Sequence, residues 1–233
     1  MRQGSRSYRF VQWFLRCFGR IVWGVRAEGR ERIPPDGALI VAPTHESYLD
    51  PLFVGAFLPR GLRYMARNTL FIRTKNGVER RRRLMSAFGR WALVIELDRE
   101  GSDRDAIRKC LAALAAGDPV LIFPEGTRSP DGSVREFRPG VALLALRSGA
   151  PVVPVSVDGT HRIWGKGMRF PRLFAGPVRI VYGEPVRYER PAKAEDVAAD
   201  IRRRVLDLRA AGQGADARDG ADAHGVAGGG PSA

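Results

Sequence analysis

The sequence predicts an α/β fold: a single domain with a mixed, largely parallel sheet flanked by helices, preceded by an N-terminal amphipathic helix at a membrane interface. Three observations lead to this prediction. Short apolar runs that suit buried strands alternate with helical patterns along the chain. The 233 residues and the hydrophobic content of 44% are enough for one domain with a substantial core. The first residues carry a separate, basic and amphipathic pattern.

The N-terminal pattern covers residues 5–26. On a helix, which turns by about 100° per residue, polar side chains occupy one arc and an aromatic-rich apolar face lies opposite. The polar arc consists of Arg2, Arg6, Arg9, Gln12, Arg16 and Arg20, and the apolar face of Phe10, Phe14, Cys17, Phe18, Ile21 and Val25. We interpret this segment as a helix lying in a membrane interface. The alternative is a helix packed on the domain's own core, with its arginines in solvent.

The other elements follow in chain order, and a Pro-Pro-Asp-Gly turn precedes the first buried strand. Asp50 and Pro51 suit the N-cap and first residue of the next helix. Strands are predicted at 38–42, 62–66, 92–97, 119–123, 151–157 and 178–182, and helices at 51–57, 103–116, 140–149 and 194–210. The predicted parts are a membrane-associating segment (1–30), the α/β domain (31–210) and a Gly- and Ala-rich tail (211–233) that we expect to be disordered.

The charge of the chain indicates an anionic partner. The formal net charge is +14, which suits nucleic acid, acidic lipid headgroups or phosphorylated small molecules. Residues 75–90 are especially basic, with a run of four arginines at 80–83. The two cysteines, Cys17 and Cys110, are too few for a disulfide framework and favour a reducing compartment. No apolar run approaches the ~20 residues of a membrane-spanning helix, and arginines interrupt any signal-peptide pattern.

The segment Thr44-His45-Glu46-Ser47-Tyr48-Leu49-Asp50 follows the first buried strand. A regular helix would place His45 and Asp50 about 140° apart, but the residue before a proline avoids the helical region, so we expect a turn. A turn can bring the carboxylate onto the imidazole and leave the second ring nitrogen free as a general base. The alternative is a simple N-cap and a loop histidine. A helical zinc site is excluded because position 49 is leucine.

The segment Phe123-Pro124-Glu125-Gly126-Thr127-Arg128-Ser129 follows another apolar strand. The ends of strands are where α/β proteins bind ligands. Arg128 suits a bidentate contact to phosphate, and Glu125 suits a polyol hydroxyl or the orientation of Arg128. The alternative is a structural Glu–Arg pair that holds a tight turn.

The two segments together resemble the His-x4-Asp motif and the substrate-binding motif of the glycerolipid acyltransferases. Weaker blocks at 92–99 and 152–155 also resemble the family, and the resemblance covers residues 35–185, with the subgroup that acylates 1-acyl-glycerol-3-phosphate as the nearest. The chain departs from the family pattern at Thr44, where many members have asparagine, and at Trp91 and Leu93, where many have a glycine-containing pattern. These departures leave the predicted catalytic residues unchanged, but they make the identity of the acyl acceptor less well specified by the resemblance.

The resemblance implies that 31–210 is an acyltransferase domain and that an acyl group passes from acyl-CoA or acyl carrier protein to lysophosphatidic acid, giving phosphatidic acid. His45 would be the general base and Asp50 its orienting partner. Acceptor binding is implied for Glu125, Gly126, Thr127, Arg128 and Arg99. No covalent acyl-enzyme, cofactor or metal is expected, so neither cysteine needs a role.

The resemblance also places the protein on the cytoplasmic face of the cell membrane, peripheral or monotopic, with the phospholipid surface as a partner. The basic residues at 80–83 then suit anionic lipid. His161 follows a strand and suits a structural role in a loop. Two other functions remain open: an acyltransferase for a different lysophospholipid or a lyso-amino-lipid, and a non-enzymatic basic protein of membrane surfaces or nucleic acid. Nucleic acid is not expected as a partner because no recognisable DNA or RNA module carries the basic residues.

Overall fold

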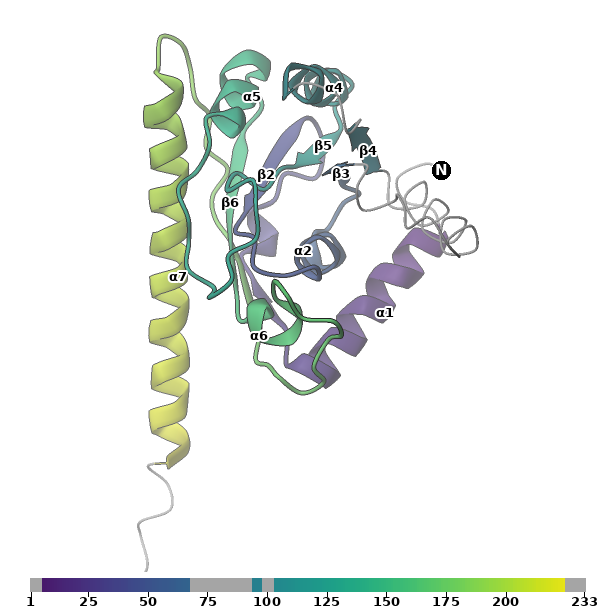
Figure 1. The fold of residues 1–233 in the computed structure, drawn as a ribbon, viewed down its shortest axis with the longest axis vertical. Coiled ribbons are helices and arrows are strands. Elements are labelled where there is room, and N and C mark those ends of the chain that lie inside the picture. Colours follow the sequence, from purple (N-terminus) through teal and green to yellow (C-terminus); the bar gives the residue numbers. More distant parts are fainter. Residues whose placement is uncertain (1–5, 68–93, 98–102, 225–233) are drawn as a thin grey trace, which may run out of the picture.

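A computed structural model describes residues 6–67, 94–97 and 103–224. Seven strands of these residues form one sheet in the order β1-β7-β6-β2-β5-β3-β4 (Figure 1). The strands are β1 (Arg26–Glu28), β2 (Leu39–Pro43), β3 (Arg63–Arg67), β4 (Val94–Leu97), β5 (Pro119–Leu121), β6 (Val152–Asp158) and β7 (Arg179–Tyr182). The helices are α1 (Arg6–Trp23), α2 (Asp50–Phe57), α4 (Asp103–Ala115), α5 (Gly140–Ser148), α6 (Thr160–Trp164) and α7 (Ala194–His224), with a 3₁₀ turn at Arg30–Arg32.

The sheet is mixed and mostly parallel, which confirms the predicted fold class. The central strands β6, β2, β5, β3 and β4 all pair in parallel. The strand β7 pairs antiparallel to β6, and β1 adds to its outer edge in parallel. The carboxyl ends of β5, β2 and β6 therefore lie side by side at one edge of the sheet.

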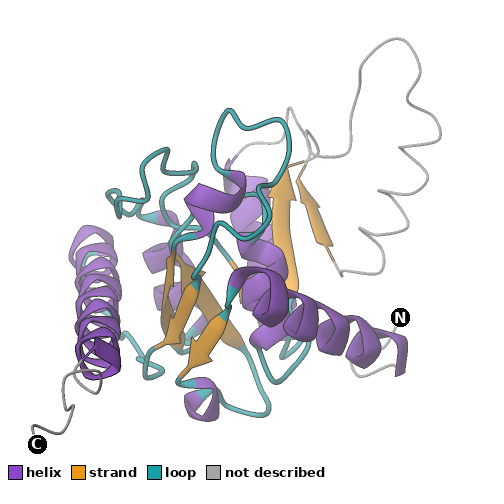
Figure 2. Cartoon of the chain, turned by 90° about the horizontal axis from the view of Figure 1, so that it is seen from below, coloured by secondary structure: helices purple, strands orange, loops and turns teal. Residues whose placement is uncertain are grey.

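Two hydrophobic cores lie on opposite faces of the sheet, because side chains alternate along buried strands. Leu39 and Val41 of β2 belong to the core under α1, α2 and α6. Ile40 and Ala42 of the same strand belong to the core under α4, α5 and α7. The sheet is thus enclosed between two layers of helices, as the view in Figure 2 shows.

The helix α1 is present, but the face that meets the protein is the polar one. Gln12, in the middle of the polar arc, is buried and donates to the carbonyls of Gly55 (2.9 Å) and Leu58 (3.2 Å). Arg16 donates to the carbonyls of Ala56 (2.5 Å) and Leu58 (3.3 Å). These carbonyls belong to the C-terminal end of α2, where a helix leaves acceptors unpaired and favours positive charge. The polar arc is therefore in part an interface with α2.

The apolar face of α1 consequently points outward. Phe10, Phe14, Phe18 and Ile21 of this face are exposed, as is Trp13 beside it, whereas Trp23 and Val25 are buried in the core. The alternative of an apolar face packed on the domain's own core is wrong for the four exposed residues of that face. No helix within the described ranges combines the length and apolarity needed to cross a bilayer.

The helix α7 is longer than its composition predicts. It continues from Ala194 to His224, beyond the predicted end at Ala210, so residues 211–224 are helical and not disordered as predicted. Glycine costs about 1 kcal/mol in a helix, but tertiary hydrogen bonds support the extension: the carbonyl of Gly212 accepts from Arg179 (2.6 Å), and Gln213 donates to Asp158 (3.3 Å). Residues 225–233 lie outside the described residues.

The other predicted elements agree with the structure to within a few residues. The sequence did not predict the three-residue edge strand β1 or the five-residue helix α6, both shorter than the patterns that reveal an element. The basic residues at 75–90, together with Trp91, Leu93 and Arg99, lie outside the described residues.

Candidate active site

Three neighbouring parallel strands deliver the site residues to one edge of the sheet. His45 follows β2, and Glu125 and Arg128 follow β5, which pairs with β2. The strand β6, on the other side of β2, leads into α6. Thr44 joins β2 to β6: its hydroxyl donates to the carbonyl of Val157 and accepts from the amide of the same residue, both at 2.9 Å.

His45 and Asp50 are brought together by the turn that the proline favours. The Nδ1 atom of His45 lies 2.8 Å from Oδ2 of Asp50, whose side chain is fully buried. A carboxylate at this position accepts a hydrogen bond from Nδ1–H and fixes the tautomer in which Nε2 is unprotonated. Nε2 has no hydrogen-bond partner among the described residues. The imidazole is also stacked on the Phe123 ring, with 3.8 Å between ring centroids.

Asp50 is not the N-cap of α2, which corrects the predicted cap. It is the first residue of the helix. Its Oδ2 accepts hydrogen bonds from the backbone amides of two preceding residues, Glu46 and Ser47, both at 2.7 Å. Its second oxygen accepts from the Thr160 hydroxyl at 2.6 Å. The carboxylate therefore folds the motif into a closed turn and holds the imidazole at the same time.

The short helix α6 supports the whole turn from Glu46 to Asp50. Thr160 at its start donates to Asp50, and the carbonyl of Trp164 at its end accepts from the Ser47 hydroxyl (2.8 Å) and the Tyr48 amide (3.3 Å). The rings of Trp164 and Tyr48 are also in contact, with centroids 5.2 Å apart. Residues that lie more than 100 positions later in the chain thus fix the position of the motif.

The second motif clamps the backbone of His45 from both sides. The Oε1 atom of Glu125 accepts from the His45 amide (3.0 Å), and the Ser129 amide donates to the His45 carbonyl (2.7 Å). The other carboxylate oxygen of Glu125, Oε2, is buried without a partner among the described residues. Burial raises the pKa of Glu125 to about 7, although the backbone amides of His45 and Arg135 interact with this carboxylate and act in the opposite direction. Oε2 is therefore an unsatisfied hydrogen-bond acceptor, which a bound ligand can satisfy.

Arg128 also has an unsatisfied buried hydrogen-bonding group, in this case a donor. Its guanidinium lies over the Tyr48 ring, 3.4 Å from the centroid, and Nη1 is buried without a partner among the described residues. Glu125 and Arg128 do not pair with each other there, so the alternative of a structural Glu–Arg pair finds no support. Free donor and acceptor positions in one turn beside an imidazole suit a ligand with both a hydroxyl and an anionic group.

The remaining predicted site residues occupy the same turn. Gly126 has a left-handed φ of 71°, and a Cβ atom there would lie 2.7 Å from Nε of Arg138. Only glycine combines this φ with so close an approach. Thr127 is half-buried between Gly126 and Arg128. Arg138, which was not predicted from the sequence, brings a second guanidinium to the motif, and this one is exposed. Arg99 lies outside the described residues.

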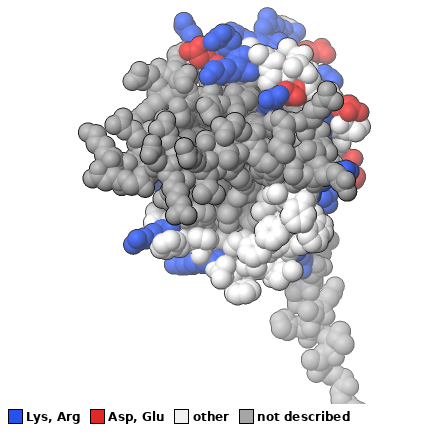
Figure 3. Space-filling model, turned by 90° about the vertical axis from the view of Figure 1, so that its right-hand side faces the viewer, with Lys and Arg blue, Asp and Glu red and all other residues white. Residues whose placement is uncertain are grey.

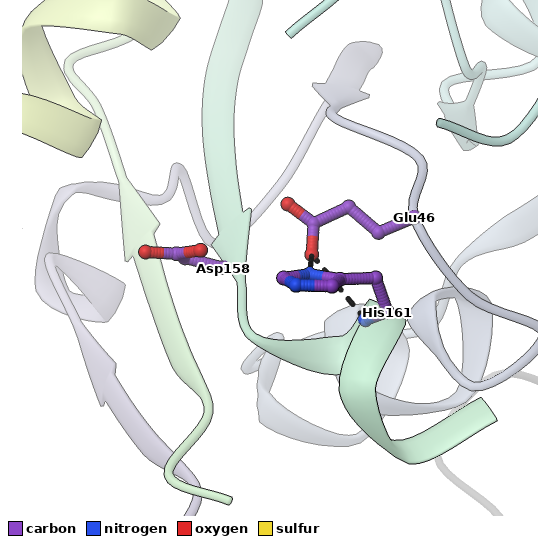
Figure 4. A group of neighbouring side chains, drawn as sticks. All are labelled: Glu46, Asp158 and His161. Atoms are coloured by element: carbon purple, nitrogen blue, oxygen red, sulfur yellow. Dashed lines mark hydrogen bonds and ion pairs between the residues drawn. The ribbon is translucent and has the colours of Figure 1, made fainter. Parts of the chain in front are cut away.

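A buried charge cluster behind the turn was also missed. Glu46 is 1% exposed, and its carboxylate contacts His161 of α6 (Figure 4). The same carboxylate also contacts Arg209 of α7. His161 Nδ1 lies 2.9 Å from Oε2 of Glu46, and this hydrogen bond raises the pKa of His161. Arg209 also donates to Asp158 (3.3 Å) and to the Val157 carbonyl (2.8 Å). Glu46, Asp158 and His161 converge as metal ligands do, but a guanidinium already supplies the positive charge between the carboxylates.

The two cysteines take no part in this arrangement. Cys110 of α4 is buried in the core, and burial raises the pKa of its thiol to about 11, which disfavours the reactive thiolate. Cys17 is half-buried on α1, which contacts α2.

The acyltransferase family model matches residues 24–158. The chain is 28% identical over 186 residues to a chloroplast 1-acyl-sn-glycerol-3-phosphate acyltransferase of Arabidopsis thaliana, covering 78% of this chain and 48% of that protein. It is 30% identical over 198 residues to a 1-acyl-sn-glycerol-3-phosphate acyltransferase of Pseudomonas aeruginosa, covering 78% and 69%. The chain spans about half the length of two chloroplast relatives and one algal relative that it matches.

A crystal structure with a similar fold is that of the 1-acyl-sn-glycerophosphate acyltransferase PlsC from Thermotoga maritima. The TM-score is 0.66 at 25% sequence identity, and the match covers 89% of this chain and 82% of the crystallised one.

Proposed function

The chain belongs to the acyltransferase family, and from this premise we propose that it transfers a fatty acyl group from acyl-CoA or acyl carrier protein to the free hydroxyl of 1-acyl-glycerol-3-phosphate, giving phosphatidic acid. Relatives named for this reaction cover most of the chain. The observation that carries the proposal is the imidazole of His45, bound through Nδ1 to buried Asp50 beside two unpaired polar groups.

In the proposed reaction Nε2 of His45 takes the proton of the acceptor hydroxyl. The freed oxygen attacks the carbonyl carbon of the thioester, the carbon–sulfur bond breaks, and the departing thiolate receives the proton from the imidazolium. Asp50 stabilises that imidazolium while both of its oxygens stay hydrogen-bonded. The step requires no cofactor or metal, and no acyl group on the protein.

Acceptor binding falls to the turn after β5. We assign the phosphate to Arg128, whose Nη1 is unpaired and whose plane is fixed by Tyr48. The exposed guanidinium of Arg138 adds a second positive charge over Gly126. The free oxygen of Glu125 suits the glycerol backbone, close to the imidazole because Glu125 also binds the His45 amide. Thr127 and Arg99 complete the set that the family resemblance implies.

The partner is a phospholipid surface, because the acceptor carries an acyl chain. We propose that residues 1–30 associate with the membrane through the exposed apolar face of α1, that 31–210 form the acyltransferase domain, and that the protein is peripheral on the cytoplasmic face. The exposed phenylalanines and tryptophan of α1 support this proposal.

The test is a His45→Ala variant assayed with one acyl donor and a panel of lyso-lipid acceptors. We expect loss of activity by about 10²–10⁴-fold, the usual contribution of a general base, with unchanged circular dichroism and vesicle binding. His224→Ala, a histidine substitution at the far end of α7, is the matched control and should keep full activity. Full activity of His45→Ala would remove the proposed base, and a preference for another lyso-lipid in the wild type would change the assigned acceptor.

A further inference from the structure

The loop Arg169–Phe174, which we call the apolar loop, holds three large hydrophobic side chains in solvent. Phe170 is 69% exposed, Leu173 61% and Phe174 76%. Phenylalanine and leucine are usually buried, and an exposed cluster of them marks a contact surface. The loop follows α6, so it belongs to the same chain segment that supports the motif turn.

The last phenylalanine of the apolar loop has a strained backbone conformation. Phe174 has a φ of 58°, and among the described residues it is the only non-glycine residue with a positive φ. A bulky side chain in this left-handed region is disfavoured, and such strain usually persists at functional positions. No packing in the structure accounts for the phenylalanine, because three quarters of it faces solvent.

The apolar loop lies against the C-terminal end of α1. The indole of Trp23 donates to the carbonyl of Arg172 at 2.8 Å. A Cβ atom on Gly176 would lie 2.2 Å from the carbonyl oxygen of Trp23, so the two backbones are in direct contact. The loop and the exposed apolar face of α1 (Phe10, Trp13, Phe14, Phe18 and Ile21) therefore belong to neighbouring surfaces.

These two segments hold eight of the eleven exposed large hydrophobic side chains in the described part of the chain. The exceptions are Tyr48, Leu143 and Leu206. Figure 3 shows uncharged side chains gathered on the lower part of the side that carries α1, with Lys and Arg at the edges. A hydrophobic surface with basic side chains at its edges is typical of proteins that insert into an anionic bilayer.

The charge of the two segments supports a lipid partner. Residues 159–183 contain Arg162, Lys166, Arg169, Arg172 and Arg179 but no aspartate or glutamate, and residues 1–27 contain six arginines and no acidic residue. Lys166, Arg169 and Arg172 are all exposed around the apolar loop. A surface that carries basic side chains and no acidic ones attracts anionic headgroups.

We propose that the apolar loop is a second bilayer anchor, in which Phe170, Leu173 and Phe174 enter the lipid while Lys166, Arg169 and Arg172 contact anionic headgroups. Together with α1 it gives two adjacent points of contact, which fixes the tilt of the domain. The loop is tied to α6 by the bond from the Arg172 amide to the Ile163 carbonyl, at 2.8 Å, so the anchor adjoins the helix that positions the motif. The inference deepens the proposed function, but lipid insertion is measurable without substrate.

The first experiment places an environment-sensitive nitrobenzoxadiazole label on the loop. In a Cys17→Ser background the remaining thiol, Cys110, is buried and unreactive, so Leu173→Cys is labelled alone. We expect a blue-shifted and brighter emission when vesicles of phosphatidylcholine with anionic phosphatidylglycerol are added. Leu206→Cys on α7, also at an exposed leucine, is the matched control and should not respond. No response at position 173 while the protein still cosediments with the vesicles would overturn the proposal.

The second experiment uses the strained residue. Phe174→Gly removes the side chain from a position where glycine has no steric penalty, so thermal stability should stay the same or rise. Vesicle binding should fall, and the triple change to serine at 170, 173 and 174 should lower the partition coefficient at least ~10-fold. Lower stability of Phe174→Gly together with unchanged vesicle binding would make the residue structural and overturn the anchor.

Two further measurements distinguish a bilayer from a second copy of the chain, and lipid insertion from acyl transfer. If the loop binds a second copy, light scattering without vesicles will show a dimer that the triple serine variant loses, and the bilayer proposal is then wrong. The wild-type chain is also assayed with lysophosphatidic acid in detergent. If the label responds to vesicles but no acyl transfer is detected, the proposed function is wrong and the anchor is supported. If acyl transfer is detected but the label does not respond, the anchor is wrong and the proposed function is supported.

Discussion

At the scale of single residues, Arg128 has a donor free for an anion. Its guanidinium rests on Tyr48, and Nη1 is buried without a partner among the described residues. Such a group gains a full hydrogen bond when an anion arrives, because it gives up no existing partner.

We therefore expect Arg128→Ala to raise the KM for lysophosphatidic acid by about 10–100-fold, which corresponds to the 1.5–3 kcal/mol of a charged hydrogen bond. The KM for the acyl donor should change little. Steady-state kinetics with each substrate varied in turn provide the measurement. Equal increases in both KM values would place Arg128 away from the acceptor phosphate.

Glu125 links the site to the pH dependence of stability. Burial raises its pKa from 4.5 in the unfolded chain to about 7 in the folded protein. Between these values the folded state binds more protons than the unfolded state, so the free energy of unfolding falls as pH rises, by up to roughly 3 kcal/mol. The contribution is fully present below pH 4.5 and is lost as pH passes through 7.

Glu125→Gln should remove this dependence, because an amide does not titrate. Urea unfolding at intervals from pH 4.5 to 8 would show a flatter curve for the variant between 4.5 and 7. The raised pKa of His161 acts in the same direction at higher pH, so the difference between the two curves isolates Glu125. Parallel curves for wild type and variant would contradict the assignment.

Site residues that depend on local chain geometry can be predicted from the sequence, whereas those that depend on long-range contacts cannot. The turn at His45 and Asp50 is a local property of a pre-proline segment, so it can be read from a few adjacent letters. The partners of that turn are not local: Thr160 and Trp164 approach it only because β6 is parallel to β2. Glu46 has the same letter as an exposed surface glutamate, and only the fold shows that it is buried against Arg209.

At the scale of elements, α1 shows what a periodic pattern leaves open. The pattern predicts an amphipathic helix, and the helix is there. The pattern does not predict which face meets the protein, because polar side chains can also bind the free carbonyls at the end of another helix. Gln12 and Arg16 do so at the end of α2, which leaves the apolar face outside.

The helix α7 carries a contact that its composition hides. Arg209 lies one residue before the predicted end of the helix and pairs with Glu46, which is buried next to His45. The arginine also donates to the Gly132 carbonyl at 2.5 Å. The last part of the chain is therefore fastened to the motif turn.

We expect Arg209→Ala to lower the free energy of unfolding by about 3–5 kcal/mol, because it leaves the buried carboxylate of Glu46 without its main partner. Arg203→Ala on the same helix is the matched control. Arg203 is 62% exposed in its surface ion pairs, which are worth less than about 1 kcal/mol. Urea unfolding of both variants is the measurement. A similar decrease in the free energy of unfolding for both would mean that the ion pair with Glu46 stabilises the protein no more than a surface ion pair does.

At the scale of the whole molecule, charge and apolar surface act at different ranges. The net charge is +14, whereas the exposed apolar side chains lie mainly on α1 and the apolar loop. Electrostatic attraction is screened within ~10 Å at 0.1 M salt and ~3 Å at 1 M. Apolar insertion is not weakened by salt in this way.

Binding to anionic vesicles should therefore separate into two parts. Raising the salt concentration should weaken binding by the full chain, and a Phe14→Ser, Phe18→Ser and Ile21→Ser variant should bind more weakly at every salt concentration. These three side chains are exposed, and of the ring contacts among the described residues the variant loses only those of Phe18 with Phe14 and Trp23, so its unfolding temperature should fall by a few degrees at most. Vesicle flotation across a salt series, with a DNA duplex as competitor, is the measurement. If the duplex removes the protein from vesicles at moderate salt, the surface is built for nucleic acid and the assignment to a membrane is wrong.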